Sequence, residues 1–546
     1  MNDEHGTNEE QVIDEEQVIS AAKAPAGLAT IALRPAVALL VEGPASIGEL
    51  VAASGISRRG IEALLAGLTT AAGDEEATPG LSLADDRWEL SDPLRAELIE
   101  GWALDGPSES GAFTDPELHT RLQAWSLGLD APRRDLDHRP ATHDGVAARL
   151  DVLDRHLDLR GAHVLVLGGR DLDAHALAAD GRAEEVAVVD VDDSVLATLG
   201  STGLDGRGPL LRWCDVRVGL PRSLADWADL VIVNPPFTPE GMAAFLAVAT
   251  DALAGPDGRV AVTYGFGETR ATLGWQVQRE MMRAAFAISA MWPDVVTYAG
   301  AEAIGGRADL YLLAPTGREG TQGEAAENLY SQGPAAARSA IEADSAPLSA
   351  ATEEAGPDAQ VIGVRRLIGG DQAPKLRSGA VPVVDLRGDP GAWLPRALLA
   401  LAAPSAVLVC DVDTADRSAD PEQRDTTGGR GWVEAHLSRW WRLEPARRAV
   451  EGADLLVARR IDDEAPASPA GPPLVGRGHA NPRNVIAEWL TRSSEIDPPP
   501  TRRQARAAAS DHLASLGATV RPGDSLLDLP LDRIAALLTD PAPASS

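Results

Sequence analysis

The stretch "VLVLGGRDLDAHALAADGRAEEVAVVDVDD", residues 164–193, joins an aliphatic run, two glycines, a helix-forming segment and a second aliphatic run that ends in aspartates. This order is typical of a βαβ unit with parallel strands. Gly168 and Gly169 let the backbone turn tightly and approach a ligand. Asp190 ends the second strand about twenty residues later, where a carboxylate accepts the hydroxyls of a ribose. The stretch predicts a Rossmann-like fold with a nucleoside site formed by Gly168, Gly169, Asp190 and Val191.

The glycine turn does not suit a dinucleotide. Arg170 and Asp171 follow the two glycines, and there is no third glycine to complete the dinucleotide pattern. Asp171 and Asp173 would repel a pyrophosphate. The turn therefore favours a nucleoside without phosphates, which points to a cofactor of the S-adenosylmethionine type and to no metal.

Further aliphatic runs alternate with helical segments up to about residue 315. They read "HVLVLGG", "EVAVVDVD", "DLVIVNPP", "RVAVTYG" and "DLYLLAP". This alternation predicts a mostly parallel sheet and an α/β fold of the class I methyltransferase type. Asp215 follows a further short strand, at the spacing where such folds contact the adenine amino group. We therefore expect Asp215 at the cofactor as well.

The stretch "LVIVNPPFTPEG", residues 230–241, predicts the site of chemistry. Two prolines must end the strand, because proline cannot donate to a sheet ladder. The Asn234 side-chain oxygen and the Pro235 carbonyl can each accept a hydrogen bond from a substrate N–H, and Phe237 offers an apolar wall or a cation–π face. Two acceptors aimed at one nitrogen would orient its lone pair toward the electrophilic carbon of a sulfonium cofactor, which is catalysis by positioning.

Five segments together resemble the bis(aminopropyl)spermidine synthase, or branched-chain polyamine synthase, family, with this chain as a divergent member. They are Leu167-Gly168-x-x-Asp171-Leu172, "AVVDVDD", "DVRVGLP", "NPPFTPEGMAAFL" and "YAGAEAIGGRADLYLL". The resemblance covers about residues 27–315. It implies transfer of aminopropyl groups from decarboxylated S-adenosylmethionine to an amine of a polyamine.

The resemblance also implies roles for single residues. Asp171, Asn234, Pro235 and Phe237 are the expected catalytic residues, and Thr238 is expected at the acceptor. Asp171 is a candidate general base, whose basicity a neighbouring Arg170 would lower if the two pair. Glu302 either supplies an acid for the polyamine or is a glutamate of a surface loop.

The chain departs from the family pattern at two places. The family's Gly-Asp-Asp-Asp-Leu turn is Gly-Gly-Arg-Asp-Leu at residues 168–172, and its Asp-Pro-Pro-Tyr is Asn-Pro-Pro-Phe at residues 234–237. Amino-group methyltransferases acting on adenine, cytosine or glutamine carry the latter motif. Two alternatives to aminopropyl transfer therefore stay open: an S-adenosylmethionine-dependent N-methyltransferase, and a catalytically degenerate nucleoside-binding or scaffold protein.

Composition shifts along the chain predict its organisation. We expect a disordered tail (1–20), a winged-helix-like module (25–105), a connector (106–160), the Rossmann-like catalytic domain (161–318), a linker (319–359), an accessory α/β region (360–462) and a helical C-terminal region (476–546). In the winged-helix-like module, only Arg58 and Arg59 mark the second helix as basic, and Asp85 and Asp86 lie at the hairpin tip. Acids there would repel phosphate, so we expect packing or dimerisation rather than DNA binding.

Charge and composition narrow the partners. The formal net charge of -33 argues against a nucleic-acid surface spread over the whole molecule. It would suit a small amine or polyamine as substrate, but we expect the excess of acids to serve mainly solubility. Cys214 and Cys410 are too few for a zinc cluster and lie in apolar contexts. No apolar run reaches the roughly 18 residues of a spanning helix, and the acidic N-terminus lacks the order of a signal peptide. We expect a cytoplasmic protein without membrane contact, and a homodimer is open.

Overall fold

The computed structural model describes residues 27–71, 80–102, 104, 113, 115–202, 204, 208–267, 270–299, 306–320, 329–330, 345–369, 372–411, 429–446, 453–461, 472–492 and 500–540. The predicted disordered tail, residues 1–20, lies outside these ranges. The chain divides into two compact units: residues 1–115 with 150–160, and residues 116–149 with 161–546. Each unit is described by itself.

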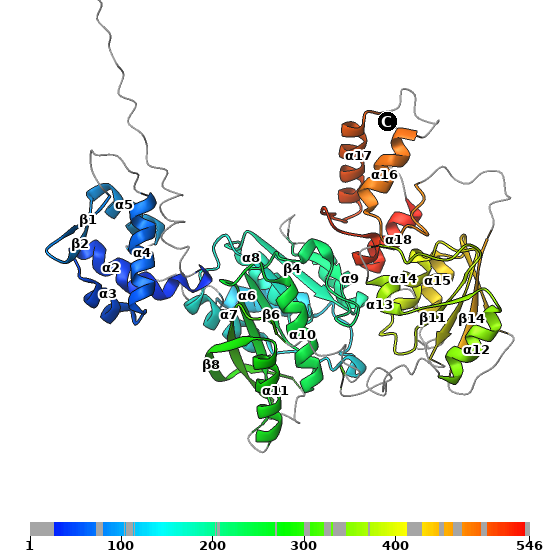
Figure 1. The fold of residues 1–546 in the computed structure, drawn as a ribbon, viewed down its shortest axis with the longest axis horizontal. Coiled ribbons are helices and arrows are strands. Elements are labelled where there is room, and N and C mark those ends of the chain that lie inside the picture. The colour runs from blue at the N-terminus through cyan, green and yellow to red at the C-terminus, as the bar shows by residue number, and fades with distance from the viewer. Residues whose placement is uncertain are drawn as a thin grey trace, which may run out of the picture. The chain divides into compact units, whose positions relative to one another are not determined.

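The first unit, drawn mostly in blue in Figure 1, packs short helices around a β-hairpin. Its elements are η1 (Gly27–Leu33), α2 (Arg34–Glu42), α3 (Ile47–Ser54), α4 (Arg58–Ala71), β1 (Leu81–Ala84), β2 (Arg87–Leu90) and α5 (Asp92–Gly101). Ser46 and Glu49 form a capping box at the start of α3, and Gly55 ends the helix with φ 70°. The predicted helix–turn–helix and hairpin are confirmed, whereas the winged-helix classification stays a prediction.

The second unit contains a seven-stranded sheet, which we call the catalytic sheet. Its strand order is β5-β4-β3-β6-β7-β9-β8. The first five strands are parallel, β9 pairs antiparallel with β7, and β8 pairs antiparallel with β9. The strands are β3 (His163–Leu167), β4 (Glu185–Asp190), β5 (Leu210–Trp213), β6 (Leu230–Val233), β7 (Arg259–Tyr264), β8 (Phe286–Thr297) and β9 (Arg307–Pro315). This topology confirms the predicted α/β, class I methyltransferase-type fold.

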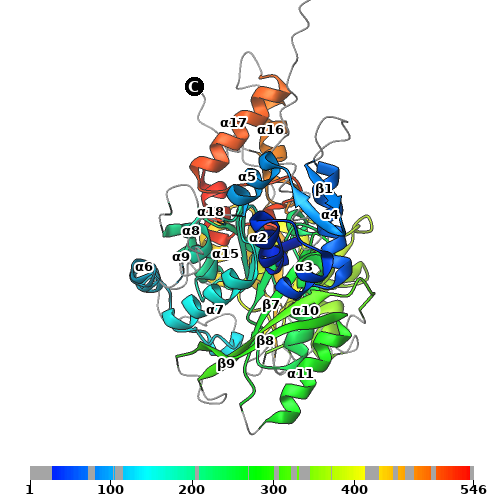
Figure 2. The same ribbon diagram turned by 90° about the vertical axis from the view of Figure 1, so that its left-hand side faces the viewer.

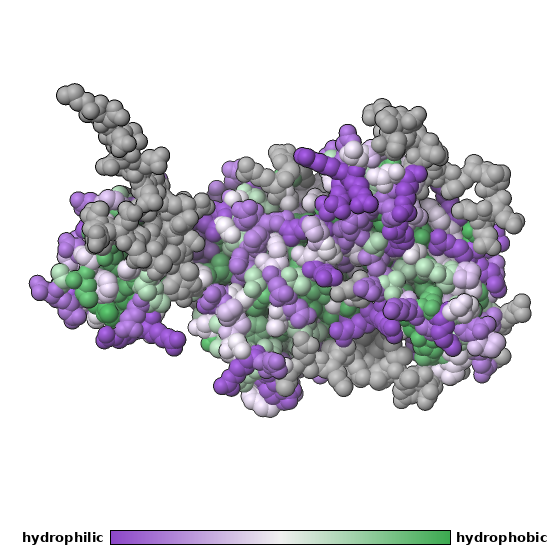
Figure 3. Space-filling model, turned by 45° about the horizontal axis from the view of Figure 1, so that its top comes forward, coloured by the Kyte–Doolittle hydropathy of each residue, from purple (hydrophilic) through white to green (hydrophobic). Residues whose placement is uncertain are grey.

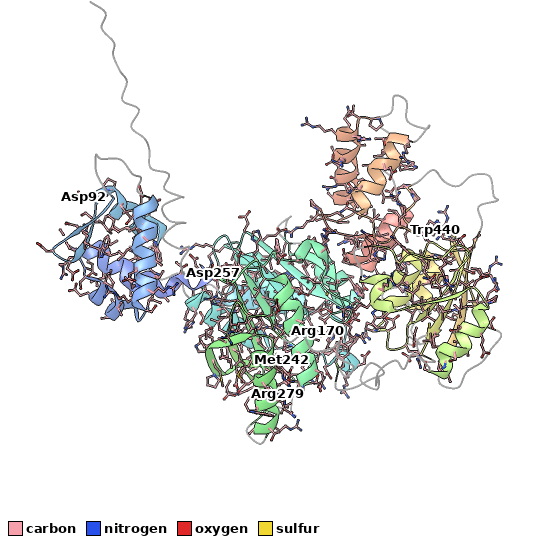
Figure 4. The ribbon with its side chains drawn as sticks, viewed as in Figure 1. Asp92, Arg170, Met242, Asp257, Arg279 and Trp440 are labelled. Atoms are coloured by element: carbon pink, nitrogen blue, oxygen red, sulfur yellow. The ribbon has the colours of Figure 1, made fainter. Side chains whose placement is uncertain are left out.

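Helices precede and cover the catalytic sheet. They are α6 (Pro116–Ser126), η3 (Arg134–Leu136), α7 (His143–His156), α8 (Asp173–Asp180), α9 (Asp193–Ser201), η4 (Arg222–Leu224), α10 (Pro239–Ala252) and α11 (Ala271–Arg283). Helix α10 packs on β6 and β3. It also contacts α11, which lies next to it in Figure 2. Met242 of α10, labelled in Figure 4, is fully buried in the apolar core between this helix and the sheet. The strands are buried on both faces, so they read as continuous aliphatic runs.

A second sheet, which we call the accessory sheet, has the order β10-β11-β12-β14-β13. Its first three strands are parallel, β14 pairs antiparallel with β12, and β13 pairs antiparallel with β14. The strands β3-β6-β7-β9-β8 of the catalytic sheet have the same order along the chain and the same directions. Its strands are β10 (Ala359–Ile362), β11 (Val381–Asp385), β12 (Ser405–Cys410), β13 (Trp441–Pro445) and β14 (Asp454–Arg460). The predicted accessory α/β region is confirmed.

The helices of this C-terminal part are α12 (Ala346–Ala355), α13 (Val364–Ile368), α14 (Trp393–Ala400), α15 (Arg430–His436), α16 (Pro482–Arg492), α17 (Arg502–Ser515), η6 (Leu526–Asp528) and α18 (Leu531–Thr539). Helix α12 lies inside the range for which the sequence predicts a linker. It packs on β11 and β12 through Leu348 and Ala351. Two fully buried side chains in an alanine-rich helix are too weak an apolar period to be recognised from sequence.

Hydrophilic and hydrophobic residues alternate on the surface without a single dominant patch on the face shown in Figure 3. Among the described residues, no helix has both the length and the apolar composition needed to cross a membrane. Cys214 and Cys410 are both buried free thiols, and burial raises the pKa of each, so neither has the character of a reactive thiolate.

Candidate functional site

A pocket opens at the carboxyl ends of β3, β4 and β6, the edge where open α/β sheets bind ligands. Seven of the residues that the sequence predicts for the site line it: Gly168, Asp171, Asp190, Val191, Asn234, Pro235 and Phe237. Gly169 and Asp215 do not belong to the lining, nor does Thr238. Glu302 lies outside the described residues.

The glycine turn and Asp190 form one hydrogen-bonded structure. Gly168 has φ 97°, a conformation that favours glycine. The Gly169 N–H donates to Asp190 Oδ2 at 2.8 Å, and the Asp192 N–H donates to Asp190 Oδ1 at 2.8 Å. A Cβ on Gly169 would lie 2.7 Å from a methyl carbon of Leu199. Gly169 therefore serves packing and holds Asp190, and it does not belong to the pocket lining.

Asp190 lies in an environment that disfavours its charge. Burial and the nearby Asp192 carboxylate raise its pKa to about 7, while the N–H groups of Asp192 and Gly169 oppose the shift. Each carboxylate oxygen accepts one backbone hydrogen bond and keeps a second lone pair. The carboxylate can thus still accept the hydroxyl groups of a ribose.

Asp171 is held by Arg149, not by its sequence neighbour Arg170. Arg149 is fully buried and donates through Nη2 to Asp171 Oδ2 at 3.2 Å and through Nε to Asp173 Oδ1 at 2.9 Å. Burial alone would lower the pKa of Arg149, but the Asp173 and Asp171 carboxylates raise it above its usual range. Asp171 also accepts the Ala141 N–H at 2.9 Å. These donors engage both carboxylate oxygens of Asp171.

The Arg170 side chain hydrogen-bonds to the main chain. Its Nη2 donates to the carbonyl oxygen of Asp130, and within the described ranges no carboxylate pairs with it. Burial lowers the pKa of Arg170. A pairing of Arg170 with Asp171, the condition under which Arg170 would lower the basicity of Asp171, is not found among the described residues, and Asp171 pairs with Arg149 of α7. Arg170, labelled in Figure 4, instead adds positive charge to the pocket lining.

Asn234 is fixed between two side chains. Its Nδ2 donates to Asp171 Oδ2 at 2.8 Å, and its Oδ1 accepts from the Tyr298 hydroxyl at 3.1 Å. One lone pair of Oδ1 remains for a substrate N–H. Phe237 also lines the pocket, and its ring centroid lies 5.9 Å from that of Tyr264, in a tilted arrangement that braces it.

Two predicted site residues lie outside the pocket lining and take part in structural hydrogen bonds. Asp215 is fully buried, and its carboxylate accepts hydrogen bonds from Arg217 Nη2 at 2.6 Å and from Trp393 Nε1 at 3.1 Å. It faces away from the pocket, which its neighbours Cys214 and Val216 line. Spacing predicts the end of a strand but not the side on which a given residue faces. Thr238 Oγ1 accepts the Gly241 N–H at 2.8 Å and thereby caps α10.

Sequence reasoning missed several residues of this site. Arg149 lies in the polar connector, where no motif marks it. Tyr298 belongs to the quoted segment "YAGAEAIGGRADLYLL", but only the fold brings it to Asn234. His138 and Tyr330 line the pocket as well. Burial lowers the pKa of His138 to about 4, so its imidazole is neutral near pH 7, and burial raises the pKa of Tyr330 above its usual range.

This arrangement combines an acid suited to a nucleoside sugar, at the end of β4, with a fixed amide and an aromatic wall after β6, and one strand, β3, lies between them. Strands β3, β4 and β6 are neighbours in the sheet, so the nucleoside and a second molecule would meet above them. The geometry suits a reaction between a nucleoside-bearing donor and a group oriented by Asn234. Among the described residues, no group of three His, Cys, Asp or Glu side chains is placed to hold a metal ion.

Comparison with known proteins supports the family resemblance. Residues 117–316 match the family model described as branched-chain polyamine synthase A C-terminal domain. An uncharacterised protein of Methanocaldococcus jannaschii is 26% identical over 190 residues, which are 34% of this chain and 48% of that protein. The match thus spans about half the length of this relative. The family predicted from the sequence is confirmed for this segment.

Solved structures show weaker likeness. A branched-chain polyamine synthase mutein from Thermus thermophilus, in complex with N4-aminopropylspermidine and 5'-methylthioadenosine, is 18% identical, with a TM-score of 0.35, and covers 57% of this chain and 96% of its own. A putative RNA methyltransferase from Pyrococcus horikoshii is 18% identical, with a TM-score of 0.29, and covers 36% of this chain and 97% of its own. At these TM-scores we base no argument on either likeness.

Proposed function

We propose that this chain, whose residues 117–316 are a divergent segment of the branched-chain polyamine synthase family, alkylates an amine nitrogen with an S-adenosyl sulfonium donor. The observation that carries the proposal is the fixed Asn234 amide, held by Asp171 and Tyr298 on the wall of a pocket that also contains Asp190. A rigid acceptor beside a ribose acid suits catalysis by positioning.

The transferred group that the family supports is aminopropyl, from decarboxylated S-adenosylmethionine to an amine of a polyamine. The acceptor must lose a proton before it reacts, since only a free nitrogen lone pair can attack. That lone pair would form a bond to the carbon next to sulfur, the carbon–sulfur bond would break, and its electrons would leave on 5'-methylthioadenosine. Asn234 Oδ1 would accept an N–H of the attacking amine and so fix the direction of its lone pair.

The charges of the pocket suit a polyamine. Asp137, Asp171 and Asp190 all line it, so acids face an approaching ammonium group. Asp171 holds Asn234 in this proposal, and its hydrogen bonds to Arg149 and Ala141 leave it little capacity as a base. The proton of the acceptor would therefore leave to solvent or to another pocket group.

Methyl transfer from S-adenosylmethionine is a second candidate, which Arg170 favours. Its guanidinium lines the pocket without a carboxylate partner among the described residues, and it would attract the carboxylate that S-adenosylmethionine retains. The same charge would repel the aminopropyl ammonium of the decarboxylated donor. A homodimeric assembly and a cytoplasmic location stay predictions from the sequence.

The test is incubation of the purified protein with spermidine and either donor, with products resolved by mass spectrometry. Addition of an aminopropyl group to spermidine supports the first candidate. Turnover with the carboxylated donor alone contradicts it and supports methyl transfer. If calorimetry detects no binding of either donor, the transferase proposal is rejected in favour of a scaffold protein.

A further inference from the structure

The two loops that form the nucleoside side of the pocket are in contact with the C-terminal part of the chain. The described residues between 345 and 540, which include the accessory sheet and the helices α12 to α18, are called the accessory region from here on. One loop follows β4 and runs from Asp190 to Asp193, where α9 begins. The other follows β5 and contains Cys214 and Val216, which line the pocket. Both lie in the second compact unit together with the accessory sheet.

Arg396 of α14 holds the first loop. It is fully buried and contacts both carboxylate oxygens of Asp193, through Nη1 at 2.9 Å and Nη2 at 3.1 Å. Its Nε donates to the carbonyl of Leu527 at 2.9 Å, and its guanidinium lies 4.0 Å from the ring of Trp213. A two-pronged pair with these extra bonds fixes both position and orientation. Asp193 is only three residues from the ribose acid Asp190.

Trp393, also on α14, holds the second loop. Its indole Nε1 donates to Asp215 Oδ2 at 3.1 Å, and Arg217, which pairs with the same carboxylate, lies 4.6 Å from the Trp393 ring. Arg217 also donates to the Gly388 carbonyl at 3.3 Å. Because Asp215 is anchored to the accessory region, its neighbours Cys214 and Val216 are presented to the pocket.

The contact contains buried apolar side chains and a buried ion pair. Leu196, Trp213 and Val218 of the catalytic domain belong to the same buried apolar cluster as Trp393 and Leu398 of α14. A buried ion pair joins Arg212 Nε to Asp524 Oδ1 at 2.9 Å. Packing of this kind transmits the position of one element to the next, since protein interiors are close-packed.

The loop after β11 is occupied by structural bonds of its own. Asp389 accepts the N–H groups of Gly391, Trp393 and Leu394 at the start of α14. The Gly388 N–H donates to Asp411 Oδ2 at 2.6 Å. In open α/β sheets this edge would bind a ligand. Here its residues hold α14 in place, and α14 in turn contacts the catalytic domain.

We propose that the accessory region is a structural part of the donor site, and that Trp393 and Arg396 are positioning residues for the donor nucleoside. The inference deepens the proposed function and rests on it, because it concerns the donor of that same reaction. The accessory region sets the two nucleoside loops and leaves the acceptor side, formed by Asn234 and Phe237, unaffected.

The test uses full-length variants, with calorimetric binding of 5'-methylthioadenosine and steady-state kinetics as readouts. Trp393→Phe removes the indole N–H and keeps an aromatic ring, so we expect nucleoside affinity to fall about three- to tenfold, the effect of one hydrogen bond. Arg396→Lys keeps the charge but loses the two-pronged contact, so we expect a larger loss, on the order of tenfold or more. In both variants the donor KM rises, while the acceptor KM and the kcat at saturating donor stay close to wild type.

Trp440→Phe is the matched control, since Trp440 is a half-buried tryptophan of the same region, labelled in Figure 4, that contacts Arg439. We expect wild-type affinity from it. If wild-type protein binds the nucleoside and folded Trp393→Phe and Arg396→Lys bind it equally well, this inference alone is overturned. If both KM values rise together, the positioning of the donor loops is likewise overturned. If wild-type protein binds no nucleoside, the proposed function is contradicted, and the inference, which rests on it, is overturned as well.

Discussion

The side-chain amide of Asn234 donates a 2.8 Å hydrogen bond to the carboxylate of Asp171, although 63 positions separate the two residues in sequence. Strands β3 and β6 are parallel neighbours, so the segments that follow them meet at the same edge of the sheet. Asp171 is in turn fixed by Arg149. The acid that the sequence suggests as a general base is thus hydrogen-bonded to the Asn234 amide.

Asn234→Ala should lower the transfer rate on the order of 10²-fold, the effect of losing the orientation of a reacting group. Donor affinity should change little, because Asn234 hydrogen-bonds to Asp171 and Tyr298, whereas the N–H groups of Gly169 and Asp192 hold Asp190. Single-turnover rates and calorimetric donor binding measure the two quantities separately. An unchanged rate would remove Asn234 from the mechanism.

Tyr298→Phe should reduce the rate by about tenfold, because it removes one hydrogen bond that orients the Asn234 amide. The free energy of unfolding should fall by less than that of Asn234→Ala, since the ring stays in place. A double variant, Tyr298→Phe with Asn234→Ala, should be no slower than Asn234→Ala alone. If the double variant instead lost as much activation free energy as the two single variants together, Tyr298 would act independently of Asn234.

Nucleoside binding should strengthen as the pH rises through about 7. Burial raises the pKa of Asp190 to about 7, so below that pH the group carries a proton that it must lose to accept ribose hydroxyls. If only the carboxylate binds, affinity for 5'-methylthioadenosine should be about tenfold weaker at pH 6 than at pH 8. Calorimetry at a series of pH values measures this.

Asp190→Asn is the control for that experiment. It should bind the nucleoside weakly at every pH and show no step near pH 7. A step of the same size in the variant would assign the titration to another group of the pocket.

Arg149→Met should lower the free energy of unfolding by about 3–5 kcal/mol, because it leaves Asp171 and Asp173 buried without their cation. Urea titration followed by tryptophan fluorescence measures the loss. Arg283→Ala is the control, since that side chain is 54% exposed and its pair with Glu280 should contribute less than about 1 kcal/mol. An equal loss of unfolding free energy in the two variants would mean that the buried Arg149 ion pairs stabilise the protein no more than an exposed pair does.

Much of the fold could be predicted because it depends on local patterns. Continuous aliphatic runs predict buried parallel strands, and the glycine pair, Asp190 and Asn234 each follow such a run at a readable spacing. The helix–turn–helix of the first unit follows from its capping box and Gly55. Helix α12 was not predictable, because its alanine-rich face contributes little apolar contrast.

The sequence by itself determined the parallel sheet, the edge at which the pocket lies and seven residues of the pocket lining, because period and spacing place residues along a strand. The family resemblance of residues 117–316 follows from their motifs. Only the tertiary structure decided which partner each polar group takes. It paired Asp171 with Arg149 instead of Arg170, turned Asp215 away from the pocket toward Trp393, and placed α14 against the nucleoside loops. Such pairings depend on long-range packing, which brings together side chains that no local pattern relates.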